Sequence, residues 1–219
     1  SPDSALMSAM VSRTFLQSID YKGDVYLFWV PGAPLLEGYK AVFEAIASSY
    51  PEVIIHEVPT EHGAAKSLTQ MQDILTANPE EGSIAGVWGA YDLLISGADQ
   101  AIKRAGRNEI NVIGLDGDRI GFQMLLEEDS PFIATAVWEP LTAGEMAGNA
   151  IILAANGRAD EIPSSVTLPS WIATRHNGVE SAETRWGPGV WEELKLDKDD
   201  VIARFPQTQE VQIVQPPAP

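Results

Sequence analysis

Five short runs of apolar, β-branched and aromatic residues alternate with helix-like segments along most of the chain. The runs occupy residues 24–30, 52–58, 83–89, 111–115 and 132–138, and each has the length and composition of a buried strand. Between them, apolar residues recur at helical spacing, as at Leu36, Tyr39 and Phe43. Near-continuous apolar strands separated by helices indicate a parallel sheet covered on both faces. With right-handed crossovers, this pattern predicts a three-layer α/β/α doubly wound domain.

The composition and the hydrophobic pattern of the sequence change towards the C-terminus. Residues 164–177 contain a last strand candidate, and Pro169 within it indicates an edge strand. Beyond Asn177 the chain carries Gly and Pro punctuation, an acidic run and a proline-rich end. We therefore expect residues 178–219 to form an irregular extension that wraps the domain, with Trp186 and Trp191 anchoring it by packing.

The composition excludes several classes of function. The 31 acidic and 14 basic side chains give a net charge of −17, which repels phosphate backbones, so we expect no nucleic-acid partner. Cysteine is absent, which removes disulfides, thiolate catalysis and Cys-based zinc sites. The three histidines lack metal-ligand spacing. We expect no metal and no cofactor.

In an open α/β sheet, ligands bind outside the carboxyl ends of the strands. Tryptophan rings beside carboxylates suit a polyhydroxylated or cationic ligand, because rings stack on C–H faces or cations and carboxylates accept hydroxyl hydrogen bonds. The candidate ligand-binding residues at these strand ends are Trp29, His62, Trp88, Tyr91, Asp92, Asp116 and Trp138.

Each candidate also has a structural interpretation. Asp116 could cap the helix that starts near Asp118, and Asp92 could cap its own helix. The tryptophans could lie in the core, and His62 could be a solvent-exposed or hydrogen-bonded structural residue. The chain has no dinucleotide-binding, Walker or nucleophile-elbow motif. Asp92 and Asp116 could perform acid/base hydrolysis, so the residues alone leave an enzyme possible, but no pattern supports it and no residue is identified as catalytic.

Several motifs follow one another in a fixed order along the chain. A helix ending in Leu-x-x-x-Pro precedes a strand, an Asp at a helix start, and a strand ending in Gly-x-Asp-Gly. Downstream lie an Ala-Thr pair before Pro and Gly, and a closing Asn. In this sequence these elements are Leu75 with Pro79, Tyr91-Asp92, Gly114 to Gly117, Ala134-Thr135 with Pro140 and Gly144, and Asn177. In order and spacing they resemble the motifs of the type I periplasmic binding proteins, the sugar receptors of ABC importers, and the resemblance covers residues 1–177.

The resemblance implies two α/β lobes that close on a solute. It implies the solute-binding component of an ABC importer, which binds a sugar or sugar-like molecule without catalysis and delivers it to the membrane permease. The location implied is periplasmic or extracellular, with export and lipid anchoring of the full-length protein. The alternative is the ligand-sensing domain of a signalling or transcription-regulatory protein.

The register of the motifs also implies which part of the fold is present. Residues 1–177 would be the C-terminal lobe, with the N-terminal lobe lacking, and the helix at 141–157 would normally belong to the other lobe. An exposed inter-lobe surface would then favour a non-native dimer.

The resemblance assigns roles residue by residue. Asp116 matches the aspartate that accepts sugar hydroxyls, and Asp92 matches the aspartate of an Asn-Asp pair in which Tyr91 replaces the asparagine. Trp138 replaces a glutamine, and His62 falls near an aromatic stacking position. The site would therefore be more aromatic than is usual, which favours a bulkier, flatter or less polar solute.

Overall fold

A computed structural model describes residues 3–214 of the 219-residue chain. Its elements in chain order are α1 (Ser4–Ser18), β1 (Gly23–Trp29), α2 (Pro34–Ala47), β2 (Val53–Pro59), α3 (Ala64–Ala77), β3 (Gly86–Gly89), α4 (Asp92–Ala105), β4 (Asn111–Asp116), α5 (Arg119–Leu126), β5 (Phe132–Trp138), α6 (Pro140–Ala155), a short 3₁₀ turn (Ala159–Glu161), β6 (Ser170–Thr174), α7 (Gly178–Trp186), α8 (Val190–Leu194) and α9 (Lys198–Arg204).

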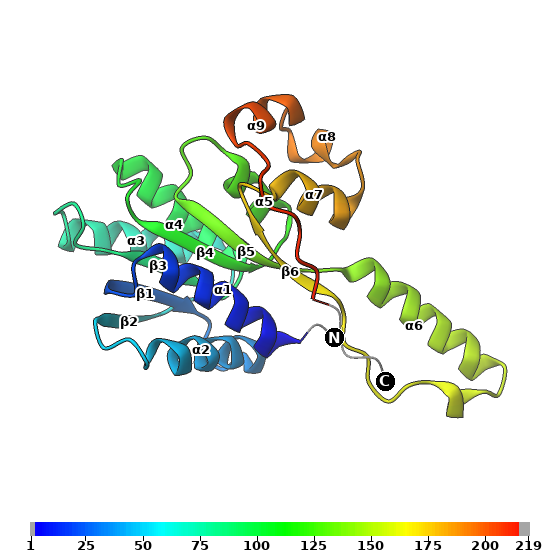
Figure 1. The fold of residues 1–219 in the computed structure, drawn as a ribbon. Helices are drawn as coiled ribbons and strands as arrows, with labels where there is room; N and C mark the ends of the chain where they lie inside the picture. Colours follow the sequence, from blue (N-terminus) through cyan, green and yellow to red (C-terminus); the bar gives the residue numbers. More distant parts are fainter. Residues whose placement is uncertain (1–2, 215–219) are drawn as a thin grey trace.

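Six strands form one sheet in the order β2-β1-β3-β4-β5-β6. The first five are parallel, and β6 runs antiparallel to β5 at the edge, directly after Pro169. Helices α1 and α2 cover one face, while α3, α4 and α5 cover the other (Figure 1). The predicted three-layer doubly wound fold is confirmed.

Each face of the sheet has its own apolar core. Phe15 and Phe43 meet Trp88 under α1 and α2, whereas Phe28 and Phe122 lie under α3, α4 and α5. All five side chains are fully buried. Because the central strands are buried on both faces, they read as continuous apolar runs in the sequence.

The C-terminal segment is more regular than the sequence pattern indicated. Residues 178–204 form the three short helices α7, α8 and α9, where we expected irregular chain. Buried Val179, Ala182 and Val201 belong to the same apolar core as residues of α5. The burial of these apolar residues therefore favours helices in this segment, despite its Gly and Pro residues. The ring of Trp186 meets that of Phe122 edge-on at 5.0 Å, as the anchoring prediction required.

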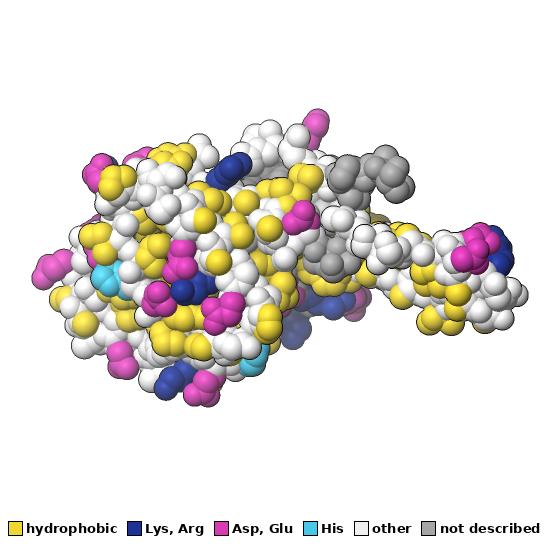
Figure 2. Space-filling view, turned by 90° about the horizontal axis from the view of Figure 1, so that it is seen from below, with side chains coloured by type: hydrophobic (Ala, Val, Ile, Leu, Met, Phe, Trp, Pro, Cys, Tyr) yellow, Lys and Arg dark blue, Asp and Glu magenta, His cyan; other side chains and the backbone are white. Residues whose placement is uncertain are grey.

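Helix α6 projects away from the rest of the fold (Figures 1 and 2). None of its residues is buried, and Leu141, Ile151 and Ile152 are 67, 70 and 60 % exposed. An apolar helix surface left in water is unusual for a monomeric protein. Over residues 3–214, no helix is both long and apolar enough to span a membrane.

Candidate functional site

The carboxyl ends of the parallel strands bring most of the predicted residues to one edge of the sheet. Trp29 ends β1, Asp116 ends β4 and Trp138 ends β5. Tyr91 precedes α4 after β3, and His62 lies in the loop after β2. Because β4 and β5 are neighbours, with Asp116 paired to Val137, Asp116 and Trp138 lie close together.

Asp116 carries the conformational and electrostatic signs of a functional residue. Its φ is +93°, a backbone conformation that costs a non-glycine residue about 1–3 kcal/mol and that clusters at functional sites. Burial and the nearby Asp118 carboxylate raise the pKa of Asp116 to about 6, while Arg185 opposes this rise. Within the described part of the chain its carboxylate accepts no hydrogen bond, yet the side chain is only partly buried. It is therefore free to accept hydrogen bonds from a ligand.

The helix-cap alternative for Asp116 is excluded, because Asp118 performs that role. Asp118 is the N-cap of α5, and its carboxylate accepts the Gly121 N–H at 2.9 Å. A helix N-terminus needs one such acceptor at this position, so the two aspartates of the Asp-Gly-Asp turn have separate tasks.

Asp92 has neither of the roles considered for it. Its side chain is fully buried, and the N-cap of α4 is Tyr91 rather than Asp92. The Asp92 carboxylate accepts the Thr135 hydroxyl at 2.8 Å and the Asp118 N–H at 3.0 Å. Burial, followed by the Asp118 and Asp116 carboxylates, raises the pKa of Asp92 well above its usual range. In this structure Asp92, at the start of α4, bonds the middle of β5 and the turn after β4, and it does not reach solvent.

Two glycines make room for the buried Asp92 carboxylate. A β-carbon at Gly114 would collide with Asp92 Oδ1, and one at Gly121 would collide with Asp92 Oδ2. Glycine at both positions therefore permits the carboxylate to sit between β4 and α5.

Trp88 lies in the core instead of at the ligand edge. It is fully buried, it stacks on Phe43 at 5.4 Å, and its indole N–H points to the Ser12 hydroxyl at 3.4 Å. The physical reason is that β3 is a central strand whose two faces are both covered by helices. Trp88 cannot contact a ligand in this conformation.

Trp29 is also largely covered. It is 7 % exposed, its indole N–H donates to Glu37 at 3.3 Å, and the Lys40 ammonium lies 4.8 Å from the ring centroid. These partners fix the ring at the end of β1, where little of it remains available to a ligand.

Tyr91 and His62 form a polar pair over the loop after β2. The Tyr91 hydroxyl lies 3.0 Å from His62 Nδ1 and accepts the Gly63 N–H at 3.0 Å. His62 is exposed and Tyr91 is half-buried. The two side chains are therefore in direct contact, and their role in ligand binding stays a prediction.

Arg185 was missed by the sequence analysis. It comes from α7, it is 7 % exposed, and its guanidinium donates to the Trp138 carbonyl oxygen. Burial lowers the pKa of Arg185, and the carboxylates of Asp92, Asp116, Asp118 and Glu139 oppose this lowering. One signal could have found it, since Val179, Ala182 and Arg185 recur at helical spacing, which puts a cation on the apolar face of the helix.

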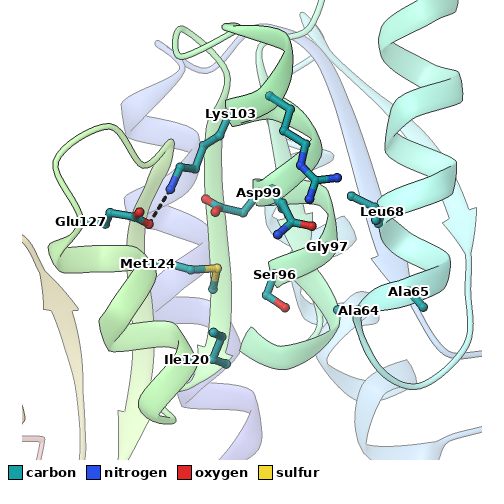
Figure 3. Close-up of a pocket in the computed structure, with 12 residues that line it drawn as sticks. Ala64, Ala65, Leu68, Ser96, Gly97, Asp99, Lys103, Ile120, Met124 and Glu127 are labelled. Atoms are coloured by element: carbon teal, nitrogen blue, oxygen red, sulfur yellow. Dashed lines mark ion pairs between the residues drawn. The ribbon is translucent and has the colours of Figure 1, made fainter. Parts of the chain in front are cut away.

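A separate groove of about 560 Å³ lies along α3, α4 and α5 (Figure 3). The ion pair of Lys103 and Glu127 crosses part of it at 2.5 Å. Asp99 lines the groove and accepts the Ser130 hydroxyl at 3.0 Å. The groove contains none of the predicted ligand-binding residues. Among residues 3–214, no group of three acidic or histidine side chains lies close enough to hold a metal ion.

A family model described as the periplasmic binding protein domain matches residues 2–159, which is most of the chain. The chain belongs to the periplasmic binding protein family. A curated member of the same class, the D-apiose import binding protein of Actinobacillus succinogenes, is 34 % identical over 76 residues, which are 34 % of this chain and 24 % of that protein.

Solved structures of periplasmic binding proteins share the fold. An ABC transporter solute-binding protein from Agrobacterium vitis with bound allitol has a TM-score of 0.76 and 24 % identity, over 84 % of this chain and 64 % of that one. The binding protein of the arabinose ABC transporter of Shewanella sp. ANA-3, bound to α- and β-L-arabinofuranose, has a TM-score of 0.75 and 22 % identity, over 89 and 64 %. This chain therefore spans less than two thirds of the length of each of these proteins.

Proposed function

We propose that this chain is part of the solute-binding component of an ABC importer and binds a neutral, sugar-like molecule without turnover. The observation that carries the proposal is the Asp116 carboxylate. Asp116 is the last residue of β4 and has a strained backbone. Its side chain is partly accessible, and no group among residues 3–214 donates a hydrogen bond to its carboxylate. Backbone strain is a cost to folding that clusters at functional sites, and an accessible carboxylate without a protein donor can accept hydrogen bonds from a ligand.

The chemistry around Asp116 favours hydroxyl donors over anions. Asp92, Asp116 and Asp118 are clustered here, and among residues 3–214 Arg185 is the cation whose charge acts on Asp116 and Asp118. A second carboxylate or a phosphate brought to this surface would be repelled. Trp138, which ends the neighbouring strand β5, would offer the C–H face of a sugar or polyol an apolar ring. D-apiose, allitol and L-arabinose, named for the related proteins, are all of this neutral class.

The arrangement of lobes and partners forms part of the proposal. We assign residues 1–177 to the C-terminal lobe of the two-lobed fold and residues 178–219 to an extension, of which the last five residues lie outside the described range. The partner would be a membrane permease, and the location periplasmic or extracellular with a lipid anchor. Family membership supports these assignments.

Helix α6 supports a further interaction of the isolated chain. We propose that residues 141–157 pack on the other lobe, and that the chain alone self-associates through this helix because Ile151 and Ile152 are exposed. Sedimentation velocity on the chain and on an Ile151→Ser/Ile152→Ser variant tests this proposal. We expect a concentration-dependent dimer that the double substitution removes, and a monomer at every concentration would contradict it.

The binding proposal is tested with defined solutes. Thermal shift and isothermal titration calorimetry are run with D-apiose, allitol and L-arabinose on the protein as its gene encodes it. We expect saturable heat and a rise in melting temperature with at least one of them, because a ligand that binds only the folded state stabilises it. Galacturonate and a sugar phosphate are the anionic controls and should not bind. Binding of the anions in preference to every neutral solute would contradict the proposal.

The ligand-sensing alternative uses the same face of the sheet, so binding alone does not separate it from import. Uptake of the labelled solute by cells with and without the gene does. Loss of uptake supports the importer. Unchanged uptake with altered transcription supports a sensor.

A further inference from the structure

The strongest feature that the proposed binding role leaves unexplained is the buried Arg185. Arg185 is only 7 % exposed, and a buried guanidinium has a large desolvation cost unless other groups compensate it. Its Nε is buried without a hydrogen-bond partner among the described residues. A buried polar atom without a partner is uncommon in a folded protein and calls for an explanation.

The contacts of Arg185 point to the end of β5 and to the neighbouring carboxylates. Its guanidinium donates to the Trp138 carbonyl and lies 5.9 Å from the Trp138 ring centroid and 5.0 Å from that of Trp186. Its charge also acts on Asp116 and Asp118 at the end of β4. One side chain of α7 therefore contacts the end of β5 and acts electrostatically on the end of β4.

We propose that Arg185 is a positioning residue of the solute site: it holds the Trp138 ring and backbone in place and supplies the positive charge that keeps the Asp116 carboxylate an acceptor. This inference rests on the proposed sugar-binding function and extends it to the C-terminal segment. It makes α7 part of the binding surface, although all the residues predicted from the sequence precede Asn177.

The charge balance at Asp116 involves every element packed around it. Asp118 before α5 and Asp92 on α4 are the neighbouring acids, and Tyr39 on α2 is close enough for the Asp116 charge to raise the pKa of its hydroxyl. Arg185 is the cation that acts on this group. Burial and the other acid raise the pKa of Asp116, and only Arg185 lowers it. Removing the cation therefore shifts Asp116 towards its protonated form near neutral pH.

The matched control is a second arginine in the same segment. Arg175, at the end of β6, donates to the carbonyl oxygens of Leu125 and Ser130, and its charge lowers the pKa of Asp99. It is half-buried. Like Arg185, Arg175 donates hydrogen bonds to backbone carbonyl oxygens, but its charge acts on Asp99 instead of Asp116. Arg175→Met is therefore the control for loss of an arginine as such.

The experiment is a carboxyl titration followed by ¹³C NMR on the chain with labelled aspartate, in which Asp116→Asn assigns the Asp116 signal. Arg185→Met should raise the pKa of Asp116 by about one unit, whereas Arg185→Lys, which keeps the charge, should change it less. Arg175→Met should raise the pKa of Asp99 and leave Asp116 unchanged. An Asp116 titration that is the same in Arg185→Met as in the parent overturns the proposal. If Arg185→Met does not fold, Arg185→Lys is used instead. The NMR chemical shift of the Trp138 indole N–H should then differ between Arg185→Lys and the parent if Arg185 positions the ring, and an unchanged shift would overturn the proposal.

Binding gives the second measurement. For whichever of D-apiose, allitol and L-arabinose binds, Arg185→Met should weaken affinity about tenfold more at pH 6 than at pH 8, because protonated Asp116 loses acceptor capacity. An equal loss at both pH values contradicts the charge role. If none of the three binds the parent protein, the proposed function fails while the titration still tests Arg185.

Discussion

The Thr135 hydroxyl oxygen lies 2.8 Å from one carboxylate oxygen of Asp92 and 3.0 Å from the other. Both side chains are fully buried. The same hydroxyl accepts the Gly117 N–H at 3.1 Å, so it connects β5 to the turn after β4 and to the start of α4. The geometry of the proposed binding turn depends on this buried contact.

Thr135→Val should destabilise the chain by about 1–3 kcal/mol, because it leaves the Asp92 carboxyl and the Gly117 N–H short of a buried partner. Urea denaturation at pH 7 measures the change. Thr76→Val is the matched control, since Thr76 is exposed on α3 and its hydroxyl only returns to the Gln72 carbonyl. Equal stability of the two variants would show that the network contributes nothing.

Two glycines in helix interiors should respond with opposite sign to the same substitution. Gly121→Ala in α5 should destabilise the fold, because its β-carbon would collide with the Asp92 carboxylate. Gly38→Ala in α2 should stabilise it by about 0.5–1 kcal/mol, since nothing lies within 4 Å of the added carbon and alanine favours the helix. Thermal denaturation of both variants measures the difference, and changes of the same sign would contradict this account of Asp92.

Asp116 and Asp118 should separate binding from stability. Asp116→Asn keeps the shape and tolerates the positive φ, so we expect unchanged folding but at least about tenfold weaker solute affinity, because a charged acceptor is lost. Asp118→Ala should instead cost about 1 kcal/mol of stability through the lost N-cap of α5. Calorimetric titration and urea denaturation are run on both variants. The assignment fails if Asp118→Ala weakens binding while Asp116→Asn does not.

Asp99 should make stability fall as the pH rises. Burial raises its pKa to about 6, more than the Ser130 hydrogen bond and nearby Lys103 lower it. A folded-state pKa above the unfolded value of about 3.9 means that the folded chain binds the proton more tightly. The stabilisation is therefore complete below pH 4 and is lost between pH 4 and about 6.

Asp99→Asn removes this titration, so its stability should decline less than that of the parent between pH 4 and 7, by about 2–3 kcal/mol. Urea midpoints at both pH values measure it. Asp129→Asn is the control, because Asp129 is exposed on the loop between α5 and β5. Its stability should decline with pH as much as that of the parent. A parent-like decline in Asp99→Asn would contradict the prediction.

The sequence predicted the fold well because its signals are local. Strand runs and helix spacing need only neighbouring residues, and the five parallel strands lie within a few residues of the predicted ranges. The candidate site was harder, since depth within the sheet is not a local property. Trp88 follows the same pattern as Trp29, yet its strand is central and the ring is sealed in the core.

The remaining errors have the same origin. Asp92 has the sequence context of a cap, but its role depends on space provided by Gly114 and Gly121 in other elements. Arg185 acts on residues about 50 to 70 positions earlier in the chain, and only the folded structure shows that α7 returns to β5. The ligand-binding roles of Asp116, Trp138, Tyr91 and His62 stay predictions.

The positive φ of Asp116 restricts how this surface can diversify. Glycine adopts such a backbone without strain, and asparagine and aspartate are among the side chains most often found there, so these three residues are the main options at this position without rebuilding the turn. Aspartate offers a charged hydrogen-bond acceptor, and asparagine offers an amide that both donates and accepts hydrogen bonds. Glycine has no side chain and leaves space for a larger ligand. Selection for a different solute would then choose among aspartate, asparagine and glycine at position 116. Discrimination between similar solutes would instead arise from substitutions at the nearby aromatic residues.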